Sequence, residues 1–288
     1  MSKISRRGLR ITAAAAGAGV IAVTAWASTA HARPADAATT PMNSGAVTST
    51  TVKLSPMPQG TIAFGKDSKG HVDVTVNAFG LTPGSSHEVR LMKGNRTVAT
   101  FSTLTANSKG QVKDETLGSD YAGTLGSLQV AMLEGNGGAP VALAEIARTA
   151  TVASTKHTYP LIPVETGAKG KNWGTPKGSA VIAYNPTAKT ISVTVNASGF
   201  EPGLHAAHIR LGSCAAQGRT QLTLRDFTAN AKGQIMKQTR MITDVTTAPP
   251  ATGWYFNLHQ GNSSDIMSNG RPTISFRPLL CANIVTKG

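Results

Sequence analysis

The stretch Val193-Thr-Val-Asn-Ala-Ser-Gly-Phe-Glu-Pro-Gly203 decides the fold, because it occurs twice in the chain. Its earlier copy is Val74-Thr-Val-Asn-Ala-Phe-Gly-Leu-Thr-Pro-Gly84. Two more blocks recur in the same order, Thr105–Gln111 as Thr228–Gln234 and Glu134–Asn136 as Gln260–Asn262. Spacings of 119, 123 and 126 residues indicate two repeated domains rather than short solenoid units.

Both halves are predicted to be all-β. Ile191, Val193 and Val195 alternate with polar residues, which places them on one face of a strand. The following Gly199-Phe-Glu-Pro-Gly203 is typical of a turn, because proline fixes φ and glycine accepts a positive φ. Short strands separated by turns favour two tandem Greek-key antiparallel β-sandwich domains, at residues 53–152 and 153–288.

The N-terminal 32 residues are typical of an export signal. Lys3, Arg6, Arg7 and Arg10 precede an apolar run, and Ala30-His-Ala32 fits a cleavage site. The arginine pair suits both the Sec and the twin-arginine route, so the route stays open. Residues 33–52 are rich in Ala, Thr, Ser and Pro and predict a flexible tether. Because no later apolar stretch reaches membrane length, we expect a secreted mature chain without a membrane span.

The mature chain is strongly basic. The signal carries four of the 28 basic residues and none of the 14 acidic ones, which leaves 24 against 14, a net charge of +10. Such a charge favours an anionic cell-wall polymer as partner; an extracellular protein is the other candidate. An ordinary solvated basic surface is the simpler interpretation. Nucleic acid is not expected, because the basic residues do not alternate with aromatic ones.

Cys214 and Cys281 are the only cysteines. In an exported chain two cysteines favour one disulfide, whereas two buried free thiols are the alternative. A bridge of this loop length would stabilise the fold by roughly 4 kcal/mol in the chain-entropy treatment.

Three histidines of the second half are candidate metal ligands. In His205-Ala-Ala-His-Ile-Arg-Leu211 the apolar Ile209 and Leu211 are expected to face inward, which turns His208 and Arg210 outward. His259 lies opposite Trp254, Phe256 and Leu258 on a later strand. If these strands are neighbours, His205, His208 and His259 converge, and three imidazoles suit copper or zinc. The competing interpretation is three ordinary surface histidines, since His-x-x-His is a common pattern.

The first half is expected to lack these histidines. Aligned on Val89 and Leu91, its strand places His87 against Ala207 and Glu88 against His208. Arg90 then falls against Arg210, which predicts a shared structural role for the two arginines. The sequence contains no Gly-x-Ser-x-Gly elbow and no phosphate loop, so no catalytic residue or cofactor-binding residue is predicted.

The second half resembles the copper/zinc superoxide dismutase-like sandwich and the related CHRD domain of exported bacterial proteins. The resemblance rests on Val193–Gly203, the segment His205–Cys214, Asn257-Leu-His259 and Cys281-Ala-Asn-Ile284. It implies a Cys214–Cys281 bridge and places His208 at the first copper histidine. Arg210 replaces the second copper histidine, and arginine cannot ligate a metal.

The sequence therefore predicts an exported, non-catalytic binding or surface-associated module. The alternative is a copper- or zinc-binding, superoxide dismutase-like protein that uses His205, His208 and His259.

Overall fold

A computed structural model describes residues 46–147, 157–167 and 170–286. Their regular structure is almost entirely β-strand, joined by one short 3-10 helix, η1 (Ile274–Phe276), so the predicted all-β class is confirmed. No helix of these residues is long and apolar enough to cross a membrane. The described residues all belong to one compact unit. The predicted export signal, residues 1–32, lies outside them.

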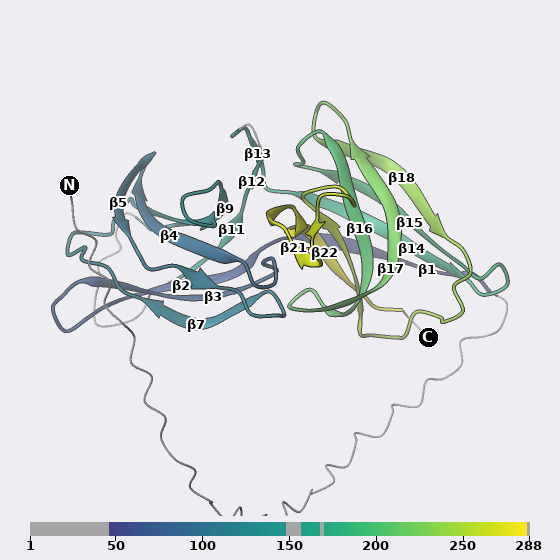
Figure 1. The fold of residues 1–288 in the computed structure, drawn as a ribbon, viewed down its shortest axis with the longest axis horizontal. Helices are drawn as coiled ribbons and strands as arrows, with labels where there is room; N and C mark the ends of the chain where they lie inside the picture. Colours follow the sequence, from purple (N-terminus) through teal and green to yellow (C-terminus); the bar gives the residue numbers. More distant parts are fainter. Residues whose placement is uncertain (1–45, 148–156, 168–169, 287–288) are drawn as a thin grey trace, which may run out of the picture. The chain divides into compact units, whose positions relative to one another are not determined.

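The largest sheet has eight antiparallel strands, drawn in green, yellow and purple in Figure 1. In spatial order they are β17 (Ala216–Ala229), β16 (Gly203–Ser213), β19 (Trp254–His259), β22 (Pro278–Ile284), β1 (Thr48–Pro56), β14 (Lys177–Asn185), β15 (Thr190–Ser198) and β18 (Gln234–Ile242). Since β1 pairs with β14 along most of its length and with β22 only at its end, it joins the two halves of this sheet.

The first repeat forms two further antiparallel sheets. One contains β10 (His157–Pro160), β2 (Gln59–Lys66), β3 (Val72–Phe79) and β7 (Gln111–Leu117). The other contains β11 (Ile162–Pro163), β9 (Pro140–Glu145), β8 (Gln129–Glu134), β4 (Ser86–Lys93) and β5 (Arg96–Thr100), with β6 (Leu104–Thr105) beside β4. Two small ribbons complete the described strands: β12 (Glu165–Thr166) with β13 (Asn172–Gly174), and β20 (Met267–Ser268) with β21 (Arg271–Pro272).

Each repeat has its own hydrophobic cluster. The predicted inward residues Ile191, Val193 and Val195 are fully buried in the second cluster, as are Phe256 and Leu258 of β19. The first cluster gathers the corresponding residues of β3, β4 and β8. Alternation along the strands therefore gave the core face correctly.

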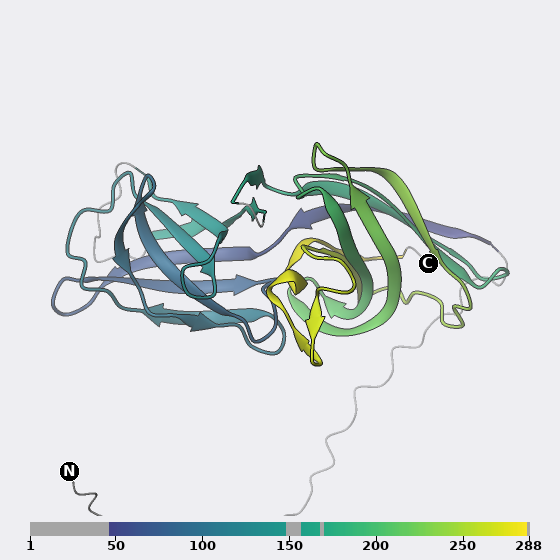
Figure 2. The same cartoon turned by 45° about the horizontal axis from the view of Figure 1, so that its top comes forward.

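The first strand of each repeat lies in the sheets of the other repeat. In Figures 1 and 2 the purple β1 runs away from β2 and along β14. Its pairing with β14 and β22 of the second repeat is mirrored by the pairing of β10 with β2 and of β11 with β9 of the first. Leu54 is accordingly buried in the second cluster and Leu161 in the first. The division into two tandem domains at residues 53–152 and 153–288 stays a prediction, and this exchange complicates it.

The predicted tether, residues 33–52, is too long at its C-terminal end. β1 begins at Thr48, and Thr48–Lys53 form a regular ladder with Tyr184–Ser179 of β14. A Thr- and Ser-rich composition does not distinguish a flexible linker from a strand whose backbone is paired on one side, because threonine is also a good strand former.

The two cysteines form the predicted bridge. Cys214, after β16, is bonded to Cys281 of β22, with their Cα atoms 5.8 Å apart. The disulfide packs with Met57 and Tyr255 in a small buried cluster, against which the half-buried Phe79 also packs. It therefore fixes the end of β16 where the second repeat meets residues of the first.

Candidate functional site

The strand pairings correct the alignment of the two repeats at their histidines. Leu91 lies opposite Val130 in β8, and it is Ile209 that takes the equivalent place opposite Phe256 in β19. His87 and His205 therefore occupy the same position, 118 residues apart. The expected match of Arg90 with Arg210 is therefore wrong. The sequence could not reveal this, because both alignments bring an apolar pair onto Val89 and Leu91.

The shared histidine has the same structural contact in both repeats. The Nδ1 atom of His87 lies 3.0 Å from the carbonyl oxygen of Leu133, and that of His205 lies 3.0 Å from the carbonyl oxygen of His259. The second nitrogen of His205 lies 2.9 Å from the carbonyl oxygen of Glu201. Both ring nitrogens of His205 thus face backbone groups, so this ring holds the start of its strand.

A segment found only in the second repeat covers the outer face of β16 and β19. Counted from the aligned residues Glu134 and Gln260, the next strand follows after five residues in the first repeat, 135–139, and after seventeen in the second, 261–277. In Figure 2 this yellow segment lies in front of the green strands. Its Ile266 and Phe276 pack on Ala206 of β16. His208 and His259 are consequently buried, with 6% and 0% exposure, and the expectation of surface histidines is wrong.

His208 and His259 form a hydrogen-bonded pair. The Nδ1–H of His259 donates to the carbonyl oxygen of Phe276, which leaves its Nε2 as an acceptor. That atom lies 3.0 Å from Nδ1 of His208, so Nδ1 of His208 is the donor. Nε2 of His208 therefore carries a lone pair, and no described residue donates to it.

Burial keeps this pair neutral. Burial, and next the positive charge of Arg210, lower the pKa of His208 to about 4. Burial also lowers the pKa of His259 well below its ordinary value, and the neighbouring His208 adds to that effect. At neutral pH both rings are thus uncharged acceptors and donors rather than cations.

The three predicted metal ligands do not converge. The rings of His208 and His259 are in contact, but the ring nitrogens of His205 contact the backbone carbonyl oxygens of His259 and Glu201. Among the described residues, no group of three His, Cys, Asp or Glu side chains is placed to hold a metal ion. Arg210 cannot replace a missing ligand. These residues do not fit the four-histidine copper cage that the dismutase resemblance implies.

Arg210 instead borders a cleft of about 590 Å³. Its Nε and Nη2 donate to the carbonyl oxygen of Gly218 at 3.0 and 2.6 Å, and its guanidinium lies 5.1 Å from the ring centre of Phe276. We call this the Arg210 cleft. Its polar side chains include Lys109, His208, Arg210, Gln217 and Arg219, and its apolar ones Ile266, Met267, Pro272 and Phe276. None of the described residues that line it is an aspartate or glutamate.

Contacts between the two repeats shape one side of this cleft. The backbone N–H of Gln217 donates to the carbonyl oxygen of Lys109 at 3.2 Å, and its side-chain amide donates to that of Leu81 at 2.7 Å. Nearby, the amide of Gln111 donates to the carbonyl oxygen of Ala215 at 2.5 Å. Because these bonds hold the β16–β17 turn and the start of β17 against the first repeat, Lys109 and Arg219 are brought to one cleft.

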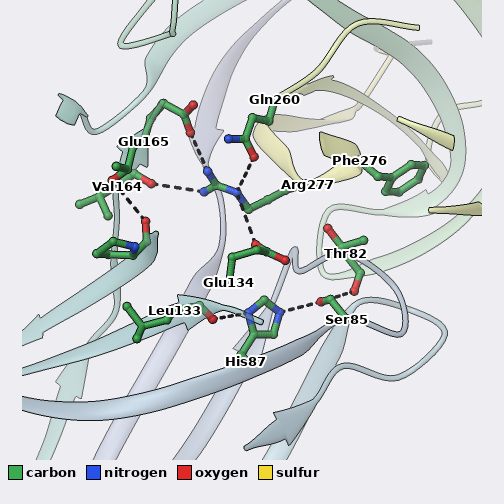
Figure 3. A network of polar contacts seen from close by, with 12 residues as sticks. Thr82, Ser85, His87, Leu133, Glu134, Val164, Glu165, Gln260, Phe276 and Arg277 are labelled. Atoms are coloured by element: carbon green, nitrogen blue, oxygen red, sulfur yellow. Dashed lines mark hydrogen bonds and ion pairs between the residues drawn. The ribbon is translucent and has the colours of Figure 1, made fainter. Parts of the chain in front are cut away.

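Arg277 forms buried ion pairs with Glu165 of the second repeat and Glu134 of the first, and Figure 3 shows these residues. Nη2 of Arg277 lies 2.6 Å from a carboxylate oxygen of Glu165, Nη1 donates to the carbonyl oxygen of Val164 at 3.2 Å, and Nε lies 4.0 Å from Glu134. Burial raises the pKa of both carboxyls, and Arg277 opposes that rise. The larger cavity beside them, about 1010 Å³, mixes acidic and basic side chains, unlike the Arg210 cleft.

Sequence reasoning missed the lysine, arginine and glutamine of the cleft. Lys109 lies in a hairpin turn of the first repeat and Gln217 and Arg219 at the start of β17 in the second, so no local spacing links them. One signal was available: between His205 and Thr228 the second repeat has five more residues than the first has between His87 and Thr105, and they lengthen β16 and β17.

Comparison with protein families confirms the CHRD resemblance for part of the chain. Residues 149–265, which are 117 of the 288 residues, match the CHRD domain. A search of curated proteins found no match. The matched segment contains β16 and most of the cleft's second-repeat residues, and it ends within the segment 261–277 that covers the histidine pair.

Proposed function

Starting from the CHRD match over residues 149–265, we propose that this protein is an exported, non-catalytic binding module that attaches to an anionic polymer outside the cell. The Arg210 cleft is its binding site. The second candidate is the copper or zinc site predicted at His205, His208 and His259, reduced to His208 and His259 because both ring nitrogens of His205 contact carbonyl oxygens. The 3.0 Å contact between His208 and His259 is the observation that favours it.

The absence of carboxylates from the lining of the cleft carries the proposal. Lys109, Arg210 and Arg219 bring three positive charges to the cleft, and no aspartate or glutamate is among the described residues that line it. Asp226, outside the lining, is near enough to oppose the lowering of the pKa of His208. Arg210 is held at 8% exposure, where its charge is screened less by water than that of a surface residue. An anionic group entering the cleft would gain from all three cations.

The charge of the whole chain supports the same ligand class. A net charge of +10 on the mature chain attracts polyanions over distances comparable to the Debye length, about 8 Å at physiological salt. Such attraction raises the rate of association. Binding is therefore expected to weaken as salt concentration rises.

Binding rather than catalysis is proposed because the imidazole nitrogens of the site are mostly engaged. Both nitrogens of His259 and both of His205 have hydrogen-bond partners. Nε2 of His208 is left without a partner, and none of the described nucleophilic or carboxylate side chains is hydrogen-bonded to it, as a nucleophile activated by a general base would be.

The test compares two double variants with equal change in charge. Lys109→Glu/Arg219→Glu alters the cleft, whereas Lys66→Glu/Lys232→Glu alters exposed lysines elsewhere. Sedimentation of the mature protein with insoluble polygalacturonate measures binding. We expect the cleft variant to bind at least about tenfold more weakly than the control variant, a difference of about 1.4 kcal/mol. Equal loss in both variants would show that only the overall charge matters and would refute the cleft as the site.

A further inference from the structure

The Arg210 cleft offers unpaired hydrogen-bond acceptors as well as positive charges. Nε2 of His208 has a lone pair with no donor among the described residues, as derived above. The Oε1 atom of Gln217 is buried and also has no partner. Both side chains are only 6% exposed. A buried acceptor left unpaired is costly, so these two atoms indicate a ligand that donates hydrogen bonds.

The orientation of Gln217 is fixed by its surroundings. Its amide nitrogen donates to the carbonyl oxygen of Leu81, so Oε1 is the atom left over. The neighbouring Gly110 has a φ of +67°, and a Cβ there would lie 2.3 Å from the same nitrogen of Gln217. A side chain at residue 110 would therefore collide with the amide of Gln217, and glycine leaves room for it.

Part of the lining of the cleft is apolar. Phe276, Ile266, Met267 and Pro272 line it, and Phe276 is held in place by its packing on Ala206. The volume of about 590 Å³ lies within the range of sites for small organic ligands, roughly 300–1,000 Å³. It exceeds what a bare phosphate or carboxylate needs.

A ligand with a negative charge, several hydroxyl donors and an apolar face matches this combination. We propose that the Arg210 cleft binds an acidic sugar residue, a hexuronate unit of a polysaccharide. Its carboxylate faces Lys109, Arg210 and Arg219, its hydroxyls donate to His208 and Gln217, and its C–H face lies against Phe276. This inference rests on the proposed function and narrows it from any polyanion to an acidic saccharide.

The experiment uses the full mature protein and three soluble probes of equal length. Trigalacturonate has the charge and the hydroxyls, triglutamate has the charge alone, and trigalactose has the hydroxyls alone. Isothermal titration calorimetry gives each Kd. We expect trigalacturonate to bind at least about tenfold more tightly than either of the others, because each of them leaves cations or acceptors unmatched.

The variant His208→Asn isolates the acceptor. The asparagine amide can still donate to His259, as Nδ1 of His208 does, but the Nε2 acceptor is gone. We expect the variant to bind trigalacturonate about tenfold more weakly while its affinity for triglutamate stays unchanged, with a thermal melting curve that shows it is folded. A variant that loses affinity for neither probe would overturn the inference.

The outcomes separate this inference from the proposed function. Equal affinity for trigalacturonate and triglutamate would refute the sugar and leave the polyanion site standing. Preference for trigalactose over both anions would refute both. If the wild-type protein binds no anionic probe and does not sediment with polygalacturonate, both are refuted.

Discussion

Replacing Leu54 tests the strand exchange, because this residue of the first repeat is buried in the core of the second. Leu54 is 1% exposed and belongs to the cluster that contains Val193, Ile209 and Phe256. Its neighbours across the ladder are residues of β14. A Leu54→Ala variant should therefore weaken the second repeat, although residue 54 belongs to the first repeat in the sequence.

The expected loss is about 3 kcal/mol. Truncation of a fully buried leucine to alanine costs about 2–5 kcal/mol, from lost burial and from the cavity that remains. Leu54 is near the end of β1, where the surroundings can relax in part, so we expect a value in the lower half of that range. Openings that release β1 should then become about a hundredfold more frequent.

Hydrogen exchange with peptide resolution locates the loss. In Leu54→Ala, amides of β14 should exchange faster, and amides of β2 should keep the wild-type rate. The matched control is Leu161→Ala, which removes the equivalent leucine from the first cluster and should speed exchange in β2 instead of β14. If Leu54→Ala loosens β2 and leaves β14 protected, the exchange of first strands is wrong.

Three further predictions concern buried charged and titratable groups. Burial lowers the pKa of His87 to about 4, and the positive charge of the nearby Arg277 adds to this effect. The hydrogen bond to Leu133 acts in the opposite direction. As the pH falls below about 6.5, this histidine therefore takes up a proton in the unfolded chain before it does so in the folded one, which favours unfolding. Urea unfolding should show that the wild-type protein is about 2–3 kcal/mol less stable at pH 4.5 than at neutral pH through this histidine, and that His87→Gln lacks this loss. Equal losses in the two proteins would contradict this. Replacing Arg277 by methionine should cost about 3–5 kcal/mol in chemical denaturation, because it leaves Glu165 buried without its partner, and adding Glu165→Gln should recover part of that loss; no recovery would argue against the ion pair. For the alternative function, elemental analysis of protein incubated with copper or zinc should find metal that the His208→Ala/His259→Ala double variant lacks, and equal metal content in both would end that hypothesis.

The strands and the disulfide could be predicted from the sequence, but the order in which the strands pair could not. Alternation at Ile191, Val193 and Val195 identifies a half-buried strand, and two cysteines in an exported chain predict one disulfide. Alternation does not say which strand lies alongside, so the place of β1 beside β14 could not be predicted. It is the same limitation that hid the equivalence of His87 and His205, since a shift of two residues keeps the same face of a strand inward.

The site was only partly within reach of the sequence. The outward positions of His208 and Arg210 followed from the apolar Ile209, and the contact of His208 with His259 follows from neighbouring strands. Their burial did not follow, because it depends on a segment of seventeen residues that packs back through Phe276. Nor could the proximity of Lys109 and Arg219 be predicted from the sequence, because the two residues belong to different repeats.

The central claim is that an acidic polymer binds in the Arg210 cleft, and NMR of the mature protein tests it most directly. Titration with trigalacturonate should shift the side-chain nitrogen signals of His208 and Arg210 and the amide signals of Lys109, Gln217 and Arg219, in proportion to one binding curve. Shifts confined to exposed lysines outside the cleft, such as Lys66 and Lys232, with His208 and Arg210 unchanged at saturation, would contradict it.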